Sequence, residues 1–161
     1  MNSSPRITPT ASANALAGAT AQTRVLNWER IGILYARVAL GTAFLAEVAD
    51  RFGLLGKHGG WGNFANFTRY TAEVNSFMPA STIPFLAWAA TVAETSLGIG
   101  LILGLWPRWV ALGTALLLAV FGVAMAISFG LKSPMDYSVF SASAGALLVA
   151  LYENRKSGAH S

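Results

Sequence analysis

Four apolar stretches, separated by polar or proline-containing segments, dominate the chain after its N-terminal part. They cover residues 31–55, 83–105, 109–130 and 137–152. A helix needs about 20 apolar residues to cross the hydrocarbon core of a bilayer, and the first three stretches reach that length. The fourth is shorter and rich in small residues, so we expect it to cross with part of the preceding loop or in a thinned bilayer. The pattern predicts an all-α fold, an integral membrane four-helix bundle.

The loops between these stretches constrain how the helices pack. Residues 107–108 and 131–136 are short connections, so we expect the second, third and fourth helices to be antiparallel neighbours. The connection at residues 56–82 is longer. Its apolar side chains recur at three- and four-residue spacing, which predicts a short amphipathic helix in the membrane interface. These side chains are Trp61, Phe64, Phe67, Tyr70, Val74 and Phe77.

Two interpretations of this amphipathic segment are open. In the first, it is an aromatic belt that anchors the bundle at the membrane surface, where Trp and Tyr are enriched. In the second, it is a lid over a cavity that opens on that face of the bundle.

The sequence divides into three predicted parts. Residues 1–27 are rich in Ser, Thr and Ala and contain Pro5 and Pro9, a composition that predicts a flexible N-terminal tail. Residues 28–153 form the four-helix transmembrane domain. Residues 154–161 form a short polar C-terminal tail.

Composition and charge favour a membrane protein over a nucleic-acid-binding one. The chain is 54% hydrophobic and only 11% charged, whereas soluble domains carry about 25% charged residues. Its net charge of +4 comes from Lys and Arg residues that are scattered singly, apart from Arg155 and Lys156, so nucleic acid is not an expected partner. More of these residues lie beside the two termini and the second loop than beside the other loops. The positive-inside rule then predicts a multi-pass inner (plasma) membrane protein with both termini in the cytoplasm.

The residue types that bind metals and redox groups are scarce. The chain has no cysteine, which excludes disulfide exchange and thiolate ligation of zinc or iron–sulfur clusters within it. Its two histidines, His58 and His160, lie outside the apolar stretches and provide no intramembrane haem ligands. We therefore expect no metal site and no cofactor held by this chain alone.

Ionisable residues inside the first two apolar stretches are the candidates for a functional site. Such residues are costly in a bilayer and usually face the bundle interior or a cavity. At a rise of about 1.5 Å per residue, Arg37 lies about 9 Å into the first helix and Glu94 about 16 Å from the start of the second. Because a long arginine side chain can cover the offset between them, we expect Arg37 and Glu94 to pair at the centre of the site.

Glu47, Asp50 and Arg51 form a secondary polar group near the end of the first helix. Glu47 and Arg51 are four residues apart, the spacing at which they can form an ion pair on one helix face. Asp50 points away from them at about 100° per residue. We expect these three residues to form a salt-bridge cluster in the interface.

Two roles for the predicted Arg37–Glu94 pair are open. A buried ion pair can serve only to fix which helix faces which. Alternatively, Glu94 takes up or releases a proton while Arg37 holds an anionic or quinone-like oxygen.

Small residues at four-residue spacing predict close helix packing. In helices surrounded by lipid, such ridges let backbones approach one another. They serve packing within one chain or, alternatively, a homodimer face. The ridges are Ser96, Gly100 and Gly104; Ala111, Ala115 and Ala119; Gly122, Ala126 and Gly130; and Ser138, Ala142 and Ala146.

Several segments resemble the DoxX family of small four-helix bacterial membrane proteins, over about residues 30–152. The stretch Arg37-Val-Ala-Leu-Gly41 opens the first helix, and Glu94-Thr-Ser-Leu-Gly98-Ile-Gly100, followed by Leu-Gly104, lies in the second. Arg108 leads the third helix. The segments Met135-Asp-Tyr-Ser-Val-Phe-Ser141 and Trp61-Gly-Asn-Phe64 resemble a subset of the family.

This resemblance implies a membrane subunit associated with redox systems, such as DoxD-like components of thiosulfate:quinone oxidoreductases. By position, Arg37 and Glu94 match the family pattern. Members often have Gly and Lys near the end of the first helix, where this chain has Glu47, Asp50 and Arg51.

We therefore expect a membrane subunit that contacts lipid, a redox partner subunit and a quinone, and that is accessory to an enzyme more than an enzyme by itself. One alternative is a carrier for a small solute or proton through the bundle. Another is a non-catalytic scaffold that recruits a soluble enzyme to the membrane.

Overall fold

The computed structural model describes the backbone of residues 9–158 and the side chains of residues 28–56 and 58–156. Every element in this part of the chain is a helix, so the all-α prediction is confirmed there. The chain divides into two compact units, residues 1–34 and residues 35–161, and each is described by itself.

Helix α1, Pro9–Arg51, contributes residues to both units. In the first unit, Trp28, Ile31 and Leu34 are more than half exposed, as expected for apolar side chains that face lipid. The backbone is already helical from Pro9 onward, because the segment is rich in alanine, the strongest helix former. The predicted flexibility of residues 1–27 stays a prediction, since their side chains lie outside the described residues.

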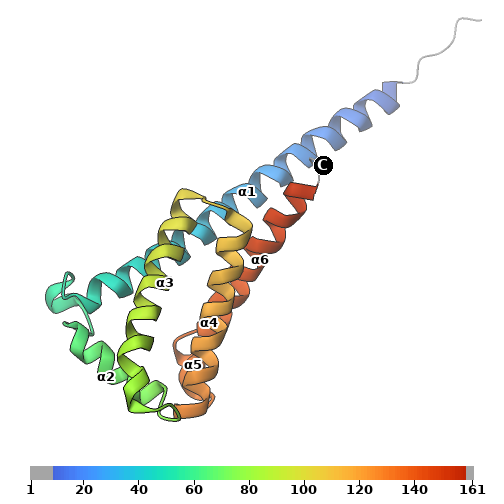
Figure 1. Ribbon diagram of the computed structural model, residues 1–161. Helices are drawn as coiled ribbons and strands as arrows, with labels where there is room; N and C mark the ends of the chain where they lie inside the picture. The colour runs from blue at the N-terminus through green and yellow to red at the C-terminus, as the bar shows by residue number, and fades with distance from the viewer. Residues whose placement is uncertain (1–8, 159–161) are drawn as a thin grey trace, which may run out of the picture. The chain divides into compact units, whose positions relative to one another are not determined.

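The second unit contains the remaining helices, and α4 lies between α3 and α6 (Figure 1). The short connection at residues 131–136 is itself largely a helical turn, α5. Two single 3-10 turns, Gly56–His58 and Ala80–Thr82, lie in the long connection before α3. The α-helices are α2, Phe64–Val74; α3, Ile83–Leu103; α4, Pro107–Phe129; α5, Lys132–Asp136; and α6, Val139–Gly158.

Local sequence explains where these helices begin and end. Helices α3 and α4 have a proline in the first turn, where the missing N–H costs no hydrogen bond. Helix α2 begins after Asn63, whose side-chain oxygen accepts the N–H of Asn66 at 2.9 Å. Helix α3 ends at Gly104, whose φ of 72° suits a residue without a Cβ.

Small residues bring the helices of the second unit into close contact. A Cβ on Gly41 would come within 2.8 Å of the carbonyl oxygen of Gly98, so α1 and α3 cross backbone to backbone there. Between α4 and α6, the Phe140 ring lies over Gly122, and Ser143 Oγ donates to the Ala115 carbonyl at 2.7 Å. These small residues therefore serve packing within one chain.

Within the described residues, three helical segments are long and apolar enough to cross a bilayer: Trp28–Arg51, Ala80–Leu103 and Pro107–Phe129. These correspond to the first three predicted spans. Helix α6 is not among them, because its last turns carry charged and polar residues such as Glu153 and Arg155. The four-helix transmembrane bundle thus stays a prediction for its fourth span.

Candidate functional site

A buried ion pair joins the end of α1 to the middle of α3. Arg51 Nη2 donates to both carboxylate oxygens of Glu94, at 2.8 and 2.6 Å. Arg51 is 4% exposed and Glu94 is 2% exposed. Both residues belong to segments apolar enough to span a membrane. Both side chains are thus almost fully buried, where a charge is tolerated only with a partner.

The same guanidinium is held by two further contacts. Its Nη1 donates to Thr91 Oγ1 at 3.1 Å, one turn before Glu94 on α3. Its Cζ lies 3.7 Å from the centre of the Phe67 ring on α2, a cation–π geometry. Arg51 Nε is buried without a hydrogen-bond partner. Three helices thus meet at Arg51, and the Phe67 ring covers the ion pair.

Aromatic side chains of the long connection form a layer around Phe67. The ring centres of Trp61 and Phe67 are 5.6 Å apart, and those of Trp61 and Tyr70 are 4.8 Å apart. The ring centres of Phe64 and Trp88 of α3 are 4.5 Å apart, with the rings tilted by 35°. Burial raises the pKa of the Tyr70 phenol, so this side chain stays neutral across physiological pH. These four uncharged rings, Trp61, Phe64, Phe67 and Tyr70, form the aromatic layer beside the ion pair.

Asp50 links this aromatic layer to α1 by hydrogen bonds. Its Oδ2 accepts the backbone N–H groups of Gly60 and Trp61 at 2.7 and 2.9 Å. The indole Nε1 of Trp61 donates to Glu47 Oε2 at 3.0 Å. Gly59 passes so close to the Asp50 carboxylate that a Cβ there would overlap Oδ1. Two consecutive residues therefore have different partners: Asp50 hydrogen-bonds the loop before α2, and Arg51 forms the ion pair with α3.

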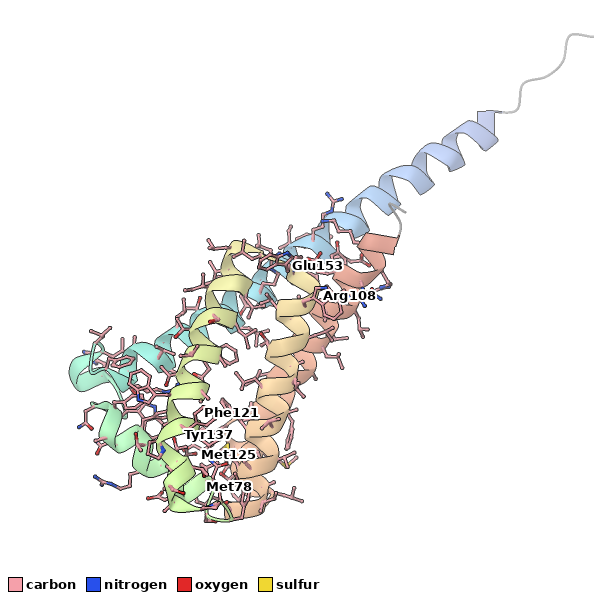
Figure 2. The ribbon with its side chains drawn as sticks, in the orientation of Figure 1. Met78, Arg108, Phe121, Met125, Tyr137 and Glu153 are labelled. Atoms are coloured by element: carbon pink, nitrogen blue, oxygen red, sulfur yellow. The ribbon has the colours of Figure 1, made fainter. Side chains whose placement is uncertain are left out.

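Arg37 occupies a separate place, at the end of α3. Its Nε and Nη2 both donate to the Leu101 carbonyl at 3.0 Å, and its Nη1 lies 3.8 Å from Glu153 Oε1 of α6. In Figure 2, Glu153 lies at the upper end of the helices, away from Met78 at the lower end. The carbonyls of the last helical turn lack intrahelical donors, so Arg37 satisfies one of them.

The expected pairing of Arg37 with Glu94 is therefore wrong. Arg37 is satisfied by Leu101 and Glu153, and Glu94 is satisfied by Arg51. Side chains on a helix lean toward its N-terminus, so Arg51 reaches back along α1 to the level of Glu94.

The expected Glu47–Arg51 pair does not form either, because Arg51 is engaged by Glu94 and Glu47 accepts from Trp61. The three residues do not form a salt-bridge cluster with one another, because Asp50 accepts from the backbone of Gly60 and Trp61. Thr91 was not predicted as a site residue, and Phe67 was predicted only as part of the amphipathic segment. Thr91 lies three residues before Glu94, which places it on the same helix face, and this spacing could have indicated it.

The site offers one acid and one fixed cation. Glu94 is the group that can exchange a proton, and Arg51 supplies the charge that holds its carboxylate. In the part of the chain that the structure describes, no three His, Asp or Glu side chains cluster as metal ligands would.

The apolar helices and the buried ion pair within them define a class, the multi-pass helical membrane protein. The DoxX family model matches residues 32–127, and the chain belongs to the DoxX family. The match includes Arg37, Arg51 and Glu94 and ends before α5. No curated protein and no solved structure matches the chain.

Proposed function

We propose that this DoxX protein is an inner-membrane subunit of a quinone-linked oxidoreductase system, and that it works with a redox partner subunit. The observation that carries the proposal is the ion pair of Arg51 and Glu94, buried inside spanning segments. An ionisable pair at that depth is costly to maintain and indicates a functional site by default. Membership of the DoxX family supports a membrane role.

In this proposal, Glu94 takes up or releases a proton while Arg51 keeps the carboxylate in place. The chain has no thiol, and the described residues offer no metal-ligand cluster. The proposal assigns electron transfer to groups of a partner and a quinone, and to this chain the proton-exchanging acid. Proton exchange requires water to reach Glu94. In this proposal the Phe67 ring, which lies over the Arg51 guanidinium, moves aside during turnover to admit it. This favours the lid interpretation of the segment that contains α2.

The proposal includes a topology with both termini in the cytoplasm and α6 as the fourth spanning helix. Ser143 of α6 bonds to Ala115 of α4, and Phe140 lies over Gly122, so α6 runs antiparallel to α4. Arg108 at the start of α4 is then on the same side as Arg155 and Lys156 at the end of α6. Clustering of basic residues on one side supports that side as cytoplasmic.

The test is electron transfer from the partner to quinone in native membranes that carry Glu94→Gln. The amide keeps the size of the side chain and an acceptor for Arg51, but it has no exchangeable acid proton. We expect a large loss of the quinone-reduction rate and loss of its dependence on pH. Asp136→Asn is the matched control, because Asp136 pairs with Lys132 at an exposed site.

An unchanged rate at every pH in Glu94→Gln membranes would refute the role of Glu94. Proton leak through the purified protein in liposomes, abolished by Glu94→Gln, would instead indicate the carrier.

A further inference from the structure

Three basic side chains lie at the end of the second unit where α4 begins and α6 ends. Arg108 is in the first turn of α4, and Arg155 and Lys156 are in the last turn of α6. Figure 2 shows Arg108 at the same end of the helices as Glu153. Among the described side chains, no ion pair joins any of the three to an acid. Arg108, Arg155 and Lys156 are called the basic patch.

Arg108 lies on the face of α4 that packs against α6. It is three residues before Ala111 and seven residues before Ala115, both of which are buried. Residues at these spacings share one face of a helix. Ser143 of α6 donates to the Ala115 carbonyl, so α6 covers this face of α4.

The antiparallel packing of α4 and α6 brings the cations of the basic patch toward one another. Lys156 follows Val149, which is buried, by seven residues and therefore lies on the buried face of α6. Counted from the contact of Ser143 with Ala115, its backbone is about 9 Å beyond that of Arg108 along the helix axis. Side chains lean toward the N-terminus of their own helix. Arg108 thus leans outward and Lys156 leans back, which shortens the separation between their charges.

The hydrogen-bond donors of Arg108 are available at the membrane surface. Its Cζ lies 4.8 Å from the centre of the Trp109 ring, and a guanidinium stacked on a ring keeps the N–H groups at its edge free. Trp109 is 64% exposed and stands in the first turn of a spanning helix, the level at which Trp is enriched. The acid in this region, Glu153, already lies 3.8 Å from Arg37. The basic patch therefore presents cations at the depth of phospholipid head groups.

From this convergence we propose that the basic patch binds the phosphodiester of an anionic phospholipid and bridges α4 and α6 through it. Arginine binds phosphate through two parallel N–H groups, and lysine binds it as a point charge. Basic residues between membrane helices recognise anionic head groups in this way. The positive-inside rule requires such residues on one side of the membrane, but not their convergence where two helices meet.

A lipid suits this patch better than an acidic segment of a soluble partner does. Leu151 is one turn before Arg155 on the same face of α6, and it is half exposed. Apolar surface thus begins directly below the cations, as a lipid with a charged head and hydrocarbon chains requires. The inference is independent of the proposed function, because it involves neither a quinone nor a redox partner.

The experiment measures phospholipid binding to the purified, delipidated protein in detergent by native mass spectrometry. The probes are phosphatidylglycerol, which is anionic, and phosphatidylcholine, which has no net charge. The variants are Arg108→Gln, Lys156→Gln and the triple variant that also carries Arg155→Gln. We expect the affinity for phosphatidylglycerol to fall about fivefold for each charge removed, and about a hundredfold in the triple variant.

Arg69→Gln is the matched control. Arg69 is also an exposed arginine without an ion pair, but it lies on α2, away from the basic patch. We expect this variant to bind phosphatidylglycerol as the unmodified protein does. Lys156→Gln changes an exposed side chain at a helix end, so its result does not depend on any effect of Arg108→Gln on folding.

Equal binding of phosphatidylglycerol by the control and the patch variants would overturn the inference. Equal affinity of the unmodified protein for the two phospholipids would overturn it as well. Displacement of the lipid by inorganic phosphate would assign the patch to free phosphate and not to lipid. Patch variants that keep the lipid but lose an acidic partner protein would assign it to that partner. Quinone reduction is not part of this measurement, so its outcome leaves the proposed function unchanged.

Discussion

Replacing Arg51 with methionine is expected to destabilise the fold severely, unless Glu94 is replaced as well. The single substitution leaves the Glu94 carboxylate, 2% exposed, without its two short hydrogen bonds from the guanidinium. Removing one partner of a buried ion pair costs about 3–5 kcal/mol, and loss of the cation–π contact with Phe67 adds about 0.5–2 kcal/mol.

The double variant Arg51→Met/Glu94→Met removes both charges and fills the same space with apolar atoms. Such replacements are often neutral or stabilising. We therefore expect the double variant to be more stable than Arg51→Met alone by about 3 kcal/mol or more. Glu94→Gln keeps an acceptor for Arg51 but removes the countercharge of this buried guanidinium, so it is also expected to cost up to about 3–5 kcal/mol.

The assay is unfolding in mixed detergent micelles, followed by far-ultraviolet circular dichroism and analysed as a double-mutant cycle. Lys132→Met is the control, because the exposed Lys132–Asp136 pair is worth about 0–1 kcal/mol. If the effects of Arg51→Met and Glu94→Met simply add in the double variant, the two residues are not coupled and the reasoning is refuted.

Three further predictions test other parts of the structure. Gly104→Ala should lower the midpoint of thermal unfolding, because Gly104 has a φ of 72° and a Cβ there would overlap the Arg37 guanidinium, while Gly145→Ala, with open space around it, should not. Gly59→Ala should increase amide hydrogen exchange across α2, since its Cβ would displace the Asp50 carboxylate that holds the loop; Gly60→Ala, with its Cβ in ordinary contact, is the control. Because the chain has no cysteine, single cysteines report topology: Leu105→Cys should react with an impermeant thiol reagent only from the cytoplasmic side, and Met135→Cys only from the opposite side. Reaction of both from the same side would contradict the proposed topology.

The helices were predictable because their signals are local. The runs of apolar residues at 83–105 and 109–130 predicted α3 and α4 to within a few residues. The spacing of aromatic residues predicted a helix in the long connection, where the structure has α2 at Phe64–Val74. No comparable local signal predicts α5, a single helical turn in a segment that contains Pro134.

The partners of the ionisable residues were not predictable in the same way. The depth of a residue along its helix can be predicted by counting residues. The rotation and register of α1 against α3, in contrast, depend on the contact between Gly41 and Gly98. That contact brings Arg37 to the Leu101 carbonyl, an acceptor present at every residue and therefore invisible in the sequence. Glu94 was correctly predicted to be a buried ionisable residue. Its partner on α1, however, is Arg51 and not the predicted Arg37.

Purification from native membranes in mild detergent decides whether this DoxX protein belongs to a quinone-linked redox assembly. Mass spectrometry then identifies both the co-purifying proteins and the isoprenoid quinone. We predict a redox subunit and a stoichiometric quinone in the complexes of the unmodified protein and of Asp136→Asn. Recovery of the protein alone, with neither a redox subunit nor a quinone, would contradict it.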